Sequence, residues 1–245
     1  MSMVKPSPVA GAKRPAKARA GPRKPSRGLG VVRFNALVEA TEQLLGEYSP
    51  DDVGLYQIAE AAGAPTASVY HFFPTKEAAF LALAERYLQG FIALGEEPIE
   101  AASLQSWQDL FALDHRRAME FYNSHPPALK IFYGGYGSLQ TRQADIRFTA
   151  GIAGSLYRRM DAAFHMPFLR DAGMNFHIAL AIMDAIWAIS YQQHDEITEA
   201  FYKESLEACM AYCRLFLPER VEPREFCLQA AARGERISLP LLSES

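Results

Sequence analysis

Cysteine is scarce in this chain of 245 residues, which contains only three cysteines, Cys209, Cys213 and Cys227. A small and odd set of this kind does not provide the disulfide framework on which small secreted domains depend. The scarcity therefore fits a protein of a reducing compartment, and we expect a cytoplasmic location.

Long apolar runs are also lacking. No stretch approaches the roughly 20 consecutive apolar residues that a bilayer-spanning helix needs, so we expect no membrane partner. The basic N-terminal segment is not followed by the apolar stretch of a secretion signal, and its prolines would break the amphipathic helix of a transit peptide. We therefore expect no targeting segment.

Catalytic and metal-binding signatures are missing as well. There is no nucleophile elbow, no phosphate-binding glycine loop and no paired-carboxylate or Cys/His pattern with a meaningful spacing. The Cys209/Cys213 pair shares a helical face but has no partner ligands nearby in sequence. Five histidines are scattered without ligand spacing, namely His115, His125, His165, His177 and His194. These observations predict a protein that is not an enzyme and that holds no metal or cofactor.

Charge is distributed unevenly along the chain. The formal net charge is −3, yet residues 1–33 contain nine basic and no acidic residues, which leaves 16 basic against 28 acidic residues in the remainder. Such a cationic segment suits a polyanion. Two interpretations stay open, a solvated extension or an arm that contacts DNA, and Arg27 and Arg33 are candidate contacts in the second.

Residues 53–80 show three short helical patterns separated by tight turns. Gly63 stands where the end of a helix needs positive φ, and Pro65 supplies a fixed φ for the first turn of a new helix two residues later. The helix before this turn has an apolar stripe at i, i+3, i+4 and i+7, formed by Leu55, Ile58, Ala59 and Ala62. This arrangement is typical of a DNA-binding helix-turn-helix motif.

The second helix of this motif places small and hydrogen-bonding side chains outward. Val69 and Phe73 are spaced to pack inward. Lys76 stands in the first turn of the next helix, which Thr75 is placed to cap, and a cation there is unfavourable unless an anion such as a DNA phosphate lies close by. The predicted DNA contacts are therefore Lys76 together with Thr66, Ala67, Ser68, Tyr70 and His71.

Tyr70, Phe73, Lys76 and Glu77 form a Tyr-x-x-Phe-x-x-Lys-Glu run. With this run, roughly residues 30–92 resemble the tetracycline-repressor-like (TetR) family of transcriptional regulators. Two positions depart from the usual pattern, because Tyr56 stands where the family often has a basic phosphate contact and Pro65 where it often has a Ser or Thr cap. The resemblance implies a homodimer, most often a repressor, that binds a double-stranded DNA operator and responds to a small-molecule effector.

The remainder of the chain follows helical spacing, and no segment alternates convincingly with period two. We predict helices at about 103–123, 126–133, 143–165, 173–193 and 198–217, with a possible short helix at 225–233. The predicted fold is all-α, with an N-terminal three-helix DNA-binding domain and a larger helical domain for ligand binding and dimerisation. Its parts are a basic disordered tail (1–28), the helix-turn-helix domain (29–75), a linking helix (76–94), the ligand-binding and dimerisation domain (95–221) and a C-terminal extension (222–245).

The predicted helix at 173–193 is apolar on two opposite faces. A helix of this kind has to be covered on both, and an isologous dimer formed with the helix that follows is an economical way to do so. A deeper monomeric core is the alternative. The predicted interface consists of Ile178, Ile182, Ala185, Ile189, Leu206, Cys209, Met210 and Cys213.

Aromatic and polar side chains gather in the middle of the larger domain. Ordinary packing explains most such groups, but aromatic residues with polar atoms also favour binding pockets. An aromatic or acyl effector would suit them, and Arg116, Arg117 or Lys130 would meet an acidic group if they turned inward rather than to solvent. The candidate pocket residues are Trp107, Phe111, His115, Tyr122, Phe132, Tyr136, His177, Met183 and Trp187. If they are only core, the protein is instead a DNA-associated helical dimer without an effector.

Overall fold

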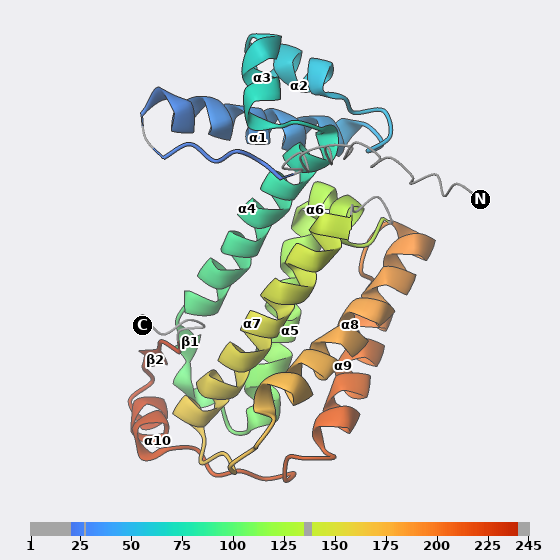
Figure 1. Ribbon diagram of the computed structural model, residues 1–245. Helices are drawn as coiled ribbons and strands as arrows, with labels where there is room; N and C mark the ends of the chain where they lie inside the picture. The colour runs from blue at the N-terminus through green and yellow to red at the C-terminus, as the bar shows by residue number, and fades with distance from the viewer. Residues whose placement is uncertain (1–20, 27, 135–138, 240–245) are drawn as a thin grey trace, which may run out of the picture.

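The computed structural model describes residues 21–26, 28–134 and 139–239, with the backbone alone for 139–141. Two groups of helices are joined by one long helix (Figure 1). The small group comprises α1 (Leu29–Glu47), α2 (Leu55–Ala61) and α3 (Thr66–Phe72), and α4 (Lys76–Glu96) leads from it into α5 (Trp107–Ser124), α6 (Pro126–Phe132), α7 (Leu139–Ala163), α8 (Ala172–His194) and α9 (Glu199–Cys213). The predicted all-α architecture is confirmed.

The turn and the buried side chains of the helix-turn-helix are those that its sequence predicts. Gly63 has φ 58°, the left-handed conformation that lets α2 stop abruptly. Val69 and Phe73 are fully buried, as their spacing predicts. The ring of Phe34 from α1 lies 5.3 Å from that of Phe73, so α1 closes the unit from behind.

Helix α4 is buried on several sides and contacts α1, α5, α6 and α7. It starts at Thr75, whose Oγ1 accepts a hydrogen bond of 3.3 Å from the Ala78 N–H. Its contact with α1 is polar as well as apolar, because Tyr87 Oη donates to Glu42 Oε1 over 2.6 Å and Arg86 pairs with the same carboxylate. The DNA-binding unit is thus attached firmly to the first half of α4.

Helix α5 begins four residues later than the sequence predicted. The residues before it form a short 3-10 turn, η1 (Ala101–Ser103), and a capping box then starts the helix. In that box Ser106 Oγ accepts from the Asp109 N–H over 3.3 Å, and Asp109 Oδ2 accepts from the Ser106 N–H over 2.8 Å.

The C-terminal extension folds back beneath the larger domain, at the end remote from the DNA-binding unit (Figure 1). It contains α10 (Glu225–Ala232) and a two-residue strand, β2 (Arg236–Ile237), which pairs antiparallel with β1 (Ile99–Glu100). The sequence predicted no strand, because two residues are too few to show a period of two. Leu239 beyond the strand is buried.

Helix α8 has the two apolar faces that the sequence predicted. Leu180, Met183 and Trp187 are buried, whereas Ile178 and Ile189 are 40% and 49% exposed. By length and composition α8 is also the one candidate membrane span among the described helices, contrary to our expectation of no such segment. In the structure it packs between α7 and α9, which accounts for the apolar residues of one face.

The conformation of Gly63 supplies a stability test. A Cβ at this position meets nothing within 4 Å, so Gly63→Ala should lower the free energy of unfolding by about 1 kcal/mol through left-handed backbone strain alone. Gly151→Ala in α7 is the matched control, since its Cβ also meets nothing and alanine favours a helix by about 0.5–1 kcal/mol. Urea unfolding should therefore shift in opposite directions for the two variants, and a shift in the same direction would contradict the argument.

Candidate DNA interface and internal cavity

Helix α3 presents one polar face to solvent. Thr66, Ala67, Tyr70 and His71 are exposed and Ser68 is half-buried, while Val69 and Phe72 of the same helix are buried against the rest of the unit. An exposed face of small and hydrogen-bonding side chains matches what a helix needs to enter the major groove.

Lys76 has protein partners of its own. Its Nζ donates to the carbonyl oxygens of Pro50 and Asp51 over 2.9 and 3.2 Å, and the side chain is half-buried. These carbonyl groups supply the negative partial charge that the sequence argument assigned to a DNA phosphate. Lys76 therefore fixes the loop between α1 and α2 and places the motif on α4.

The described part of the basic segment lies against the motif. The Arg23 N–H donates to the Phe72 carbonyl over 2.8 Å, and Lys24 Nζ lies 2.7 Å from Glu85 Oε2. Arg33 is exposed on α1. Residues 21–26 are thus attached beside the end of α3, whereas Arg27 and residues 1–20 lie outside the described residues.

A cavity lies between α4, α5, α7 and α8. Its volume is about 120 Å³, and its wall is largely apolar. The predicted pocket residues that line it are Phe111, His115, Tyr122 and Met183. Helix α4 adds Leu88, Phe91 and Leu94, so the helix that begins at the DNA-binding unit also forms one wall.

The other predicted pocket residues lie elsewhere. Phe132 and His177 line a neighbouring recess between α6, α7 and α8. Trp107 and Trp187 are fully buried and border neither space. Their indole N–H groups make hydrogen bonds within the core. Tyr136 lies outside the described residues.

The polar atoms of His115 and Trp187 meet at one hydroxyl group. Ser205 Oγ donates its hydrogen to the Tyr202 carbonyl over 2.8 Å, so its lone pairs accept from Trp187 Nε1, 2.9 Å away, and from His115 Nε2, 2.7 Å away. This network assigns the Nε2–H tautomer to His115. Burial lowers the pKa of His115 to about 3, so this cavity residue is neutral near pH 7.

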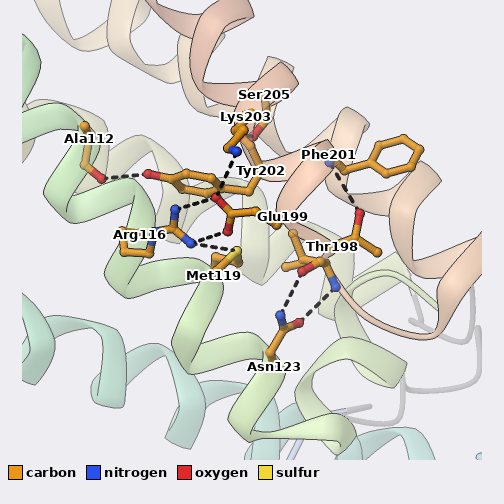
Figure 2. Close-up of polar contacts among 11 residues, drawn as sticks. Ala112, Arg116, Met119, Asn123, Thr198, Glu199, Phe201, Tyr202, Lys203 and Ser205 are labelled. Atoms are coloured by element: carbon orange, nitrogen blue, oxygen red, sulfur yellow. Dashed lines mark hydrogen bonds and ion pairs between the residues drawn. The ribbon is translucent and has the colours of Figure 1, made fainter.

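Of the three cations that the sequence offered to an acidic ligand, Arg117 alone borders the cavity. Figure 2 shows Arg116 turned toward α9, where its guanidinium donates to Glu199 over 2.6 and 2.9 Å. It also lies 3.7 Å from the centre of the Tyr202 ring. Lys130 donates to the Leu45 and Tyr48 carbonyl groups, over 2.6 and 3.1 Å, and so ties α6 to the end of α1.

The sequence analysis missed a buried ion pair on the cavity wall. Arg159 is 1% exposed, and its Nη1 lies 2.5 Å from Asp114 Oδ2 while its Nε donates to the Leu239 carbonyl over 2.5 Å. Its Nη2 has no hydrogen-bond partner among the described residues. Burial raises the pKa of Asp114, and the positive charge of Arg159 opposes that rise.

Two further carboxyl groups line both the cavity and the neighbouring recess, those of Asp145 and Asp184. Asp184 Oδ1 accepts from Tyr133 Oη over 3.0 Å. Burial, and then repulsion from Asp145, raise the pKa of Asp184 to about 7. The sequence does indicate Asp184 and Arg159, because each places a charge on an apolar stripe of its helix. Asp184 stands at i+4 from Leu180 on α8, and Arg159 stands at i+3 from Leu156 on α7.

Three of the eight predicted interface residues lie in the core of the protomer. Cys209, Met210 and Cys213 are buried within the protomer, where Cys209 Sγ donates to the Ala179 carbonyl over 3.1 Å. Burial raises the pKa of both thiols to about 12. These three residues pack α9 onto α8, whereas the exposed face carries Ile178, Ala185 and Ile189, with Ile182 and Leu206 half-buried.

Residues 37–83, which include the whole helix-turn-helix, match the model of a family described as bacterial regulatory proteins, tetR family. This segment of the chain is a TetR-family DNA-binding segment. Compared by sequence with curated proteins, the chain has no significant match.

Solved structures of TetR-family proteins share the fold across both domains. A TetR-family transcriptional regulator from Streptomyces coelicolor is 19% identical, with 77% of this chain and 99% of that chain covered and a TM-score of 0.57. SmeT, the repressor of the Stenotrophomonas maltophilia multidrug efflux pump SmeDEF, is 16% identical over 76% and 91% of the two chains, with a TM-score of 0.54. A complex of SmeT with triclosan is 13% identical over 77% and 93%, also at 0.54.

The raised pKa of Asp184 predicts a pH-dependent stability. The ordinary pKa is 3.8 and the folded value about 7, so the folded state holds this proton more tightly, and stability falls as pH rises from about 4 to 7. Asp184→Asn removes that loss and keeps an acceptor for Tyr133. The variant should be more stable than the wild type at pH 8, and the difference should shrink toward pH 4.

Urea unfolding across this pH range measures the effect. Glu39→Gln, an exposed carboxylate on α1 changed in the same way, should leave the pH profile unaltered. Parallel profiles for the wild type and Asp184→Asn would show that Asp184 has the same proton affinity in both states.

Proposed function

We propose that this TetR-family protein is a cytoplasmic, sequence-specific transcriptional repressor that leaves its operator when a small, largely apolar effector occupies the internal cavity. The observation that carries the proposal is the position of α4. Its first turn holds the helix-turn-helix through Lys76, and its Leu88, Phe91 and Leu94 line the cavity. The parts are a DNA-binding domain (29–75), a linking helix (76–94) and an effector and dimer domain (95–221).

In this proposal the exposed face of α3 reads the operator. Thr66, Ala67 and Ser68 face base edges, and Tyr70 and His71 meet phosphates or sugars, which fix register without reading sequence. Arg33 and the basic arm with Arg27 add phosphate contacts, for which the anchoring of residues 21–26 beside α3 is the support. Lys76 acts indirectly, by placing the motif.

The proposed homodimer forms through the exposed face of α8 together with α9. Ile178, Ile182, Ala185 and Ile189 follow one another along that face, and an uncovered apolar stripe of this kind marks a protein interface. A two-fold axis there presents the two recognition helices to successive major grooves of a pseudo-palindromic operator, about 34–36 Å apart or a multiple of it.

Effector binding is supported by the cavity and by a relative. SmeT, a repressor with the same fold, has been solved in a complex with triclosan. Here an effector between α4 and α7 would press on Phe91, whose ring lies 4.3 Å from Phe121 and 4.8 Å from Tyr122 of α5. A tilt of α4 then changes the separation of the two α3 helices in the dimer. The cavity favours this function over a helical dimer without an effector.

The proposed interface is tested by Ile178→Glu. A charge on this apolar stripe should shift sedimentation equilibrium from dimer to monomer and weaken binding to a full operator, identified beforehand by selection of bound duplexes from a random pool. Phe168→Glu, in an exposed loop where Phe168 is 90% exposed, is the control and should change neither property. A variant at Ile178 that stays dimeric would exclude this face.

The proposed effector response is tested by reciprocity. An apolar compound found by thermal shift should bind the free dimer more tightly than the operator-bound dimer, by the same factor by which it weakens operator binding. That factor is typically about 5- to 150-fold. Equal affinities for the compound in the two titrations would exclude this allosteric account.

A further inference from the structure

We propose that the cavity selects an amphipathic monocarboxylate, whose carboxylate pairs with Arg159 and Arg117 and whose apolar part lies between α4 and α7. The inference rests on the proposed effector function of the cavity and names the chemical class of its ligand. It is carried by an unsatisfied guanidinium group, by the unequal pairing of the two cations and by the order of side chains along the wall.

The guanidinium group of Arg159 has donors without acceptors. Arginine has five N–H groups, and Nε and Nη1 of Arg159 reach the Leu239 carbonyl and Asp114. Nη2 has no partner among the described residues although its side chain is 1% exposed. A buried polar group left in this state is destabilising, more so when it is charged. A ligand carboxylate within reach of Nη2 would satisfy it, because guanidinium donors match carboxylate oxygens in geometry.

The two cations at this end of the cavity are paired unequally. Arg159 pairs with Asp114 at 2.5 Å, whereas Arg117 acts on that carboxyl group only through its charge. The other acidic partner of Arg117 is Glu97, which lies 3.7 Å away and is 56% exposed, and an exposed ion pair of that length contributes little. Arg117 also donates to the Leu94 and Glu97 carbonyl groups over 3.3 and 3.4 Å, and it is the cation on the cavity wall that is paired more weakly with a carboxylate.

The competing interpretation is a cationic ligand at the opposite end of the cavity. Asp184 there already accepts from the Tyr133 hydroxyl over 3.0 Å, whereas Asp145 lies 3.7 Å from the exposed Arg142, so decylamine is the ligand that tests this interpretation. Asp184 also has a pKa of about 7, so it loses its charge without a cation when pH falls below neutrality. These carboxyl groups repel a second anionic group, which is why the proposed ligand has one carboxylate and an uncharged tail.

The apolar part of the cavity wall lies next to the guanidinium group of Arg159. Leu156 precedes Arg159 by three residues on α7, and residues three apart on a helix are neighbours on its surface. Ile152 and Phe148 continue the stripe at spacings of four, and Phe91 and Leu88 line the cavity from α4. Asp145 and Arg159 are fourteen residues apart on one helix, about 21 Å, so the tail of a ligand shorter than this does not reach the acidic end.

The test compares three ligands with the same ten-carbon chain, decanoate, decanol and decylamine, by isothermal titration calorimetry at pH 8 without DNA. Decanoate should bind the wild type about tenfold or more tightly than decanol, which corresponds to at least one charge-assisted hydrogen bond. Arg159→Gln and Arg117→Gln should each remove most of that advantage and leave decanol binding nearly unchanged. Arg116→Gln is the matched control, since Arg116 pairs with Glu199 outside the cavity, and it should bind all three ligands as the wild type does.

Decanol binding shows that a variant still has its cavity. Arg159→Gln leaves Asp114 without its buried partner, so if that variant does not fold, Arg117→Gln carries the test, because Arg117 makes its ion pair with exposed Glu97. The proposal is overturned if decanol binds as tightly as decanoate, if decylamine binds most tightly, or if Arg117→Gln weakens decanol and decanoate equally.

The same ligands separate this inference from the function on which it rests. Decanoate that binds as expected and leaves operator affinity unchanged would contradict the effector role and uphold the ligand class. Release of the operator by decylamine or decanol, with decanoate inactive, would uphold the effector role and overturn the ligand class.

Discussion

The structure depends on one constraint, the need to cover helix α4. From Ala78 to Ala84 every residue of this helix is buried, and no single neighbour can surround a helix that is apolar all round. The DNA-binding unit covers the start of α4 through α1, and the larger domain covers the remainder through α5, α6 and α7. The two domains therefore share a helix, and the DNA-binding unit cannot tilt relative to α4 without exposing apolar surface.

The polar contacts across this shared helix act in the same direction. Glu42 of α1 binds Arg86 and Tyr87 of α4, and Lys130 of α6 binds carbonyl oxygens at the end of α1. Hydrogen bonds and ion pairs have preferred geometries, whereas apolar contacts have none. These polar contacts therefore resist the sliding of one helix along another. In the proposed effector response, a displacement of α4 would for this reason move the whole unit, α3 included.

The fold was largely predictable from the sequence, because periodicity is a local signal. The Gly63 turn, the inward Val69 and Phe73 and the two faces of α8 all follow from spacings of three or four residues. The two-residue strands β1 and β2 are not local in this sense, since Ile99 pairs with Ile237 across most of the chain. Periodicity carries no information about such a pair.

The cavity was harder to predict than the fold. Of nine predicted pocket residues four line it, because aromatic residues on a buried helix face serve packing as readily as binding, and Trp107 and Trp187 serve packing. The charged residues on apolar stripes, Arg159 and Asp184, were the better indicators. Burying a charge is unfavourable without a partner, so a charge at a core position calls for a specific explanation, whereas a buried tryptophan does not. Cys209 and Cys213, which the sequence analysis placed at the interface, lie in the core, where burial keeps both thiols protonated.

Helix α8 links the cavity to the proposed dimer interface, as α4 links the cavity to the DNA-binding unit. One face carries Leu180, Met183 and Asp184 on the cavity wall, and the opposite face carries Ile178 and Ile189 in solvent. The cavity is thus bounded by the helix that positions the recognition helix and by the helix that would set the two-fold axis. In the proposed dimer, the separation of the two recognition helices would depend on both. A ligand between α4 and α8 need not move α3 by any contact of its own, because a small change in the angle between its two walls is multiplied by the length of α4.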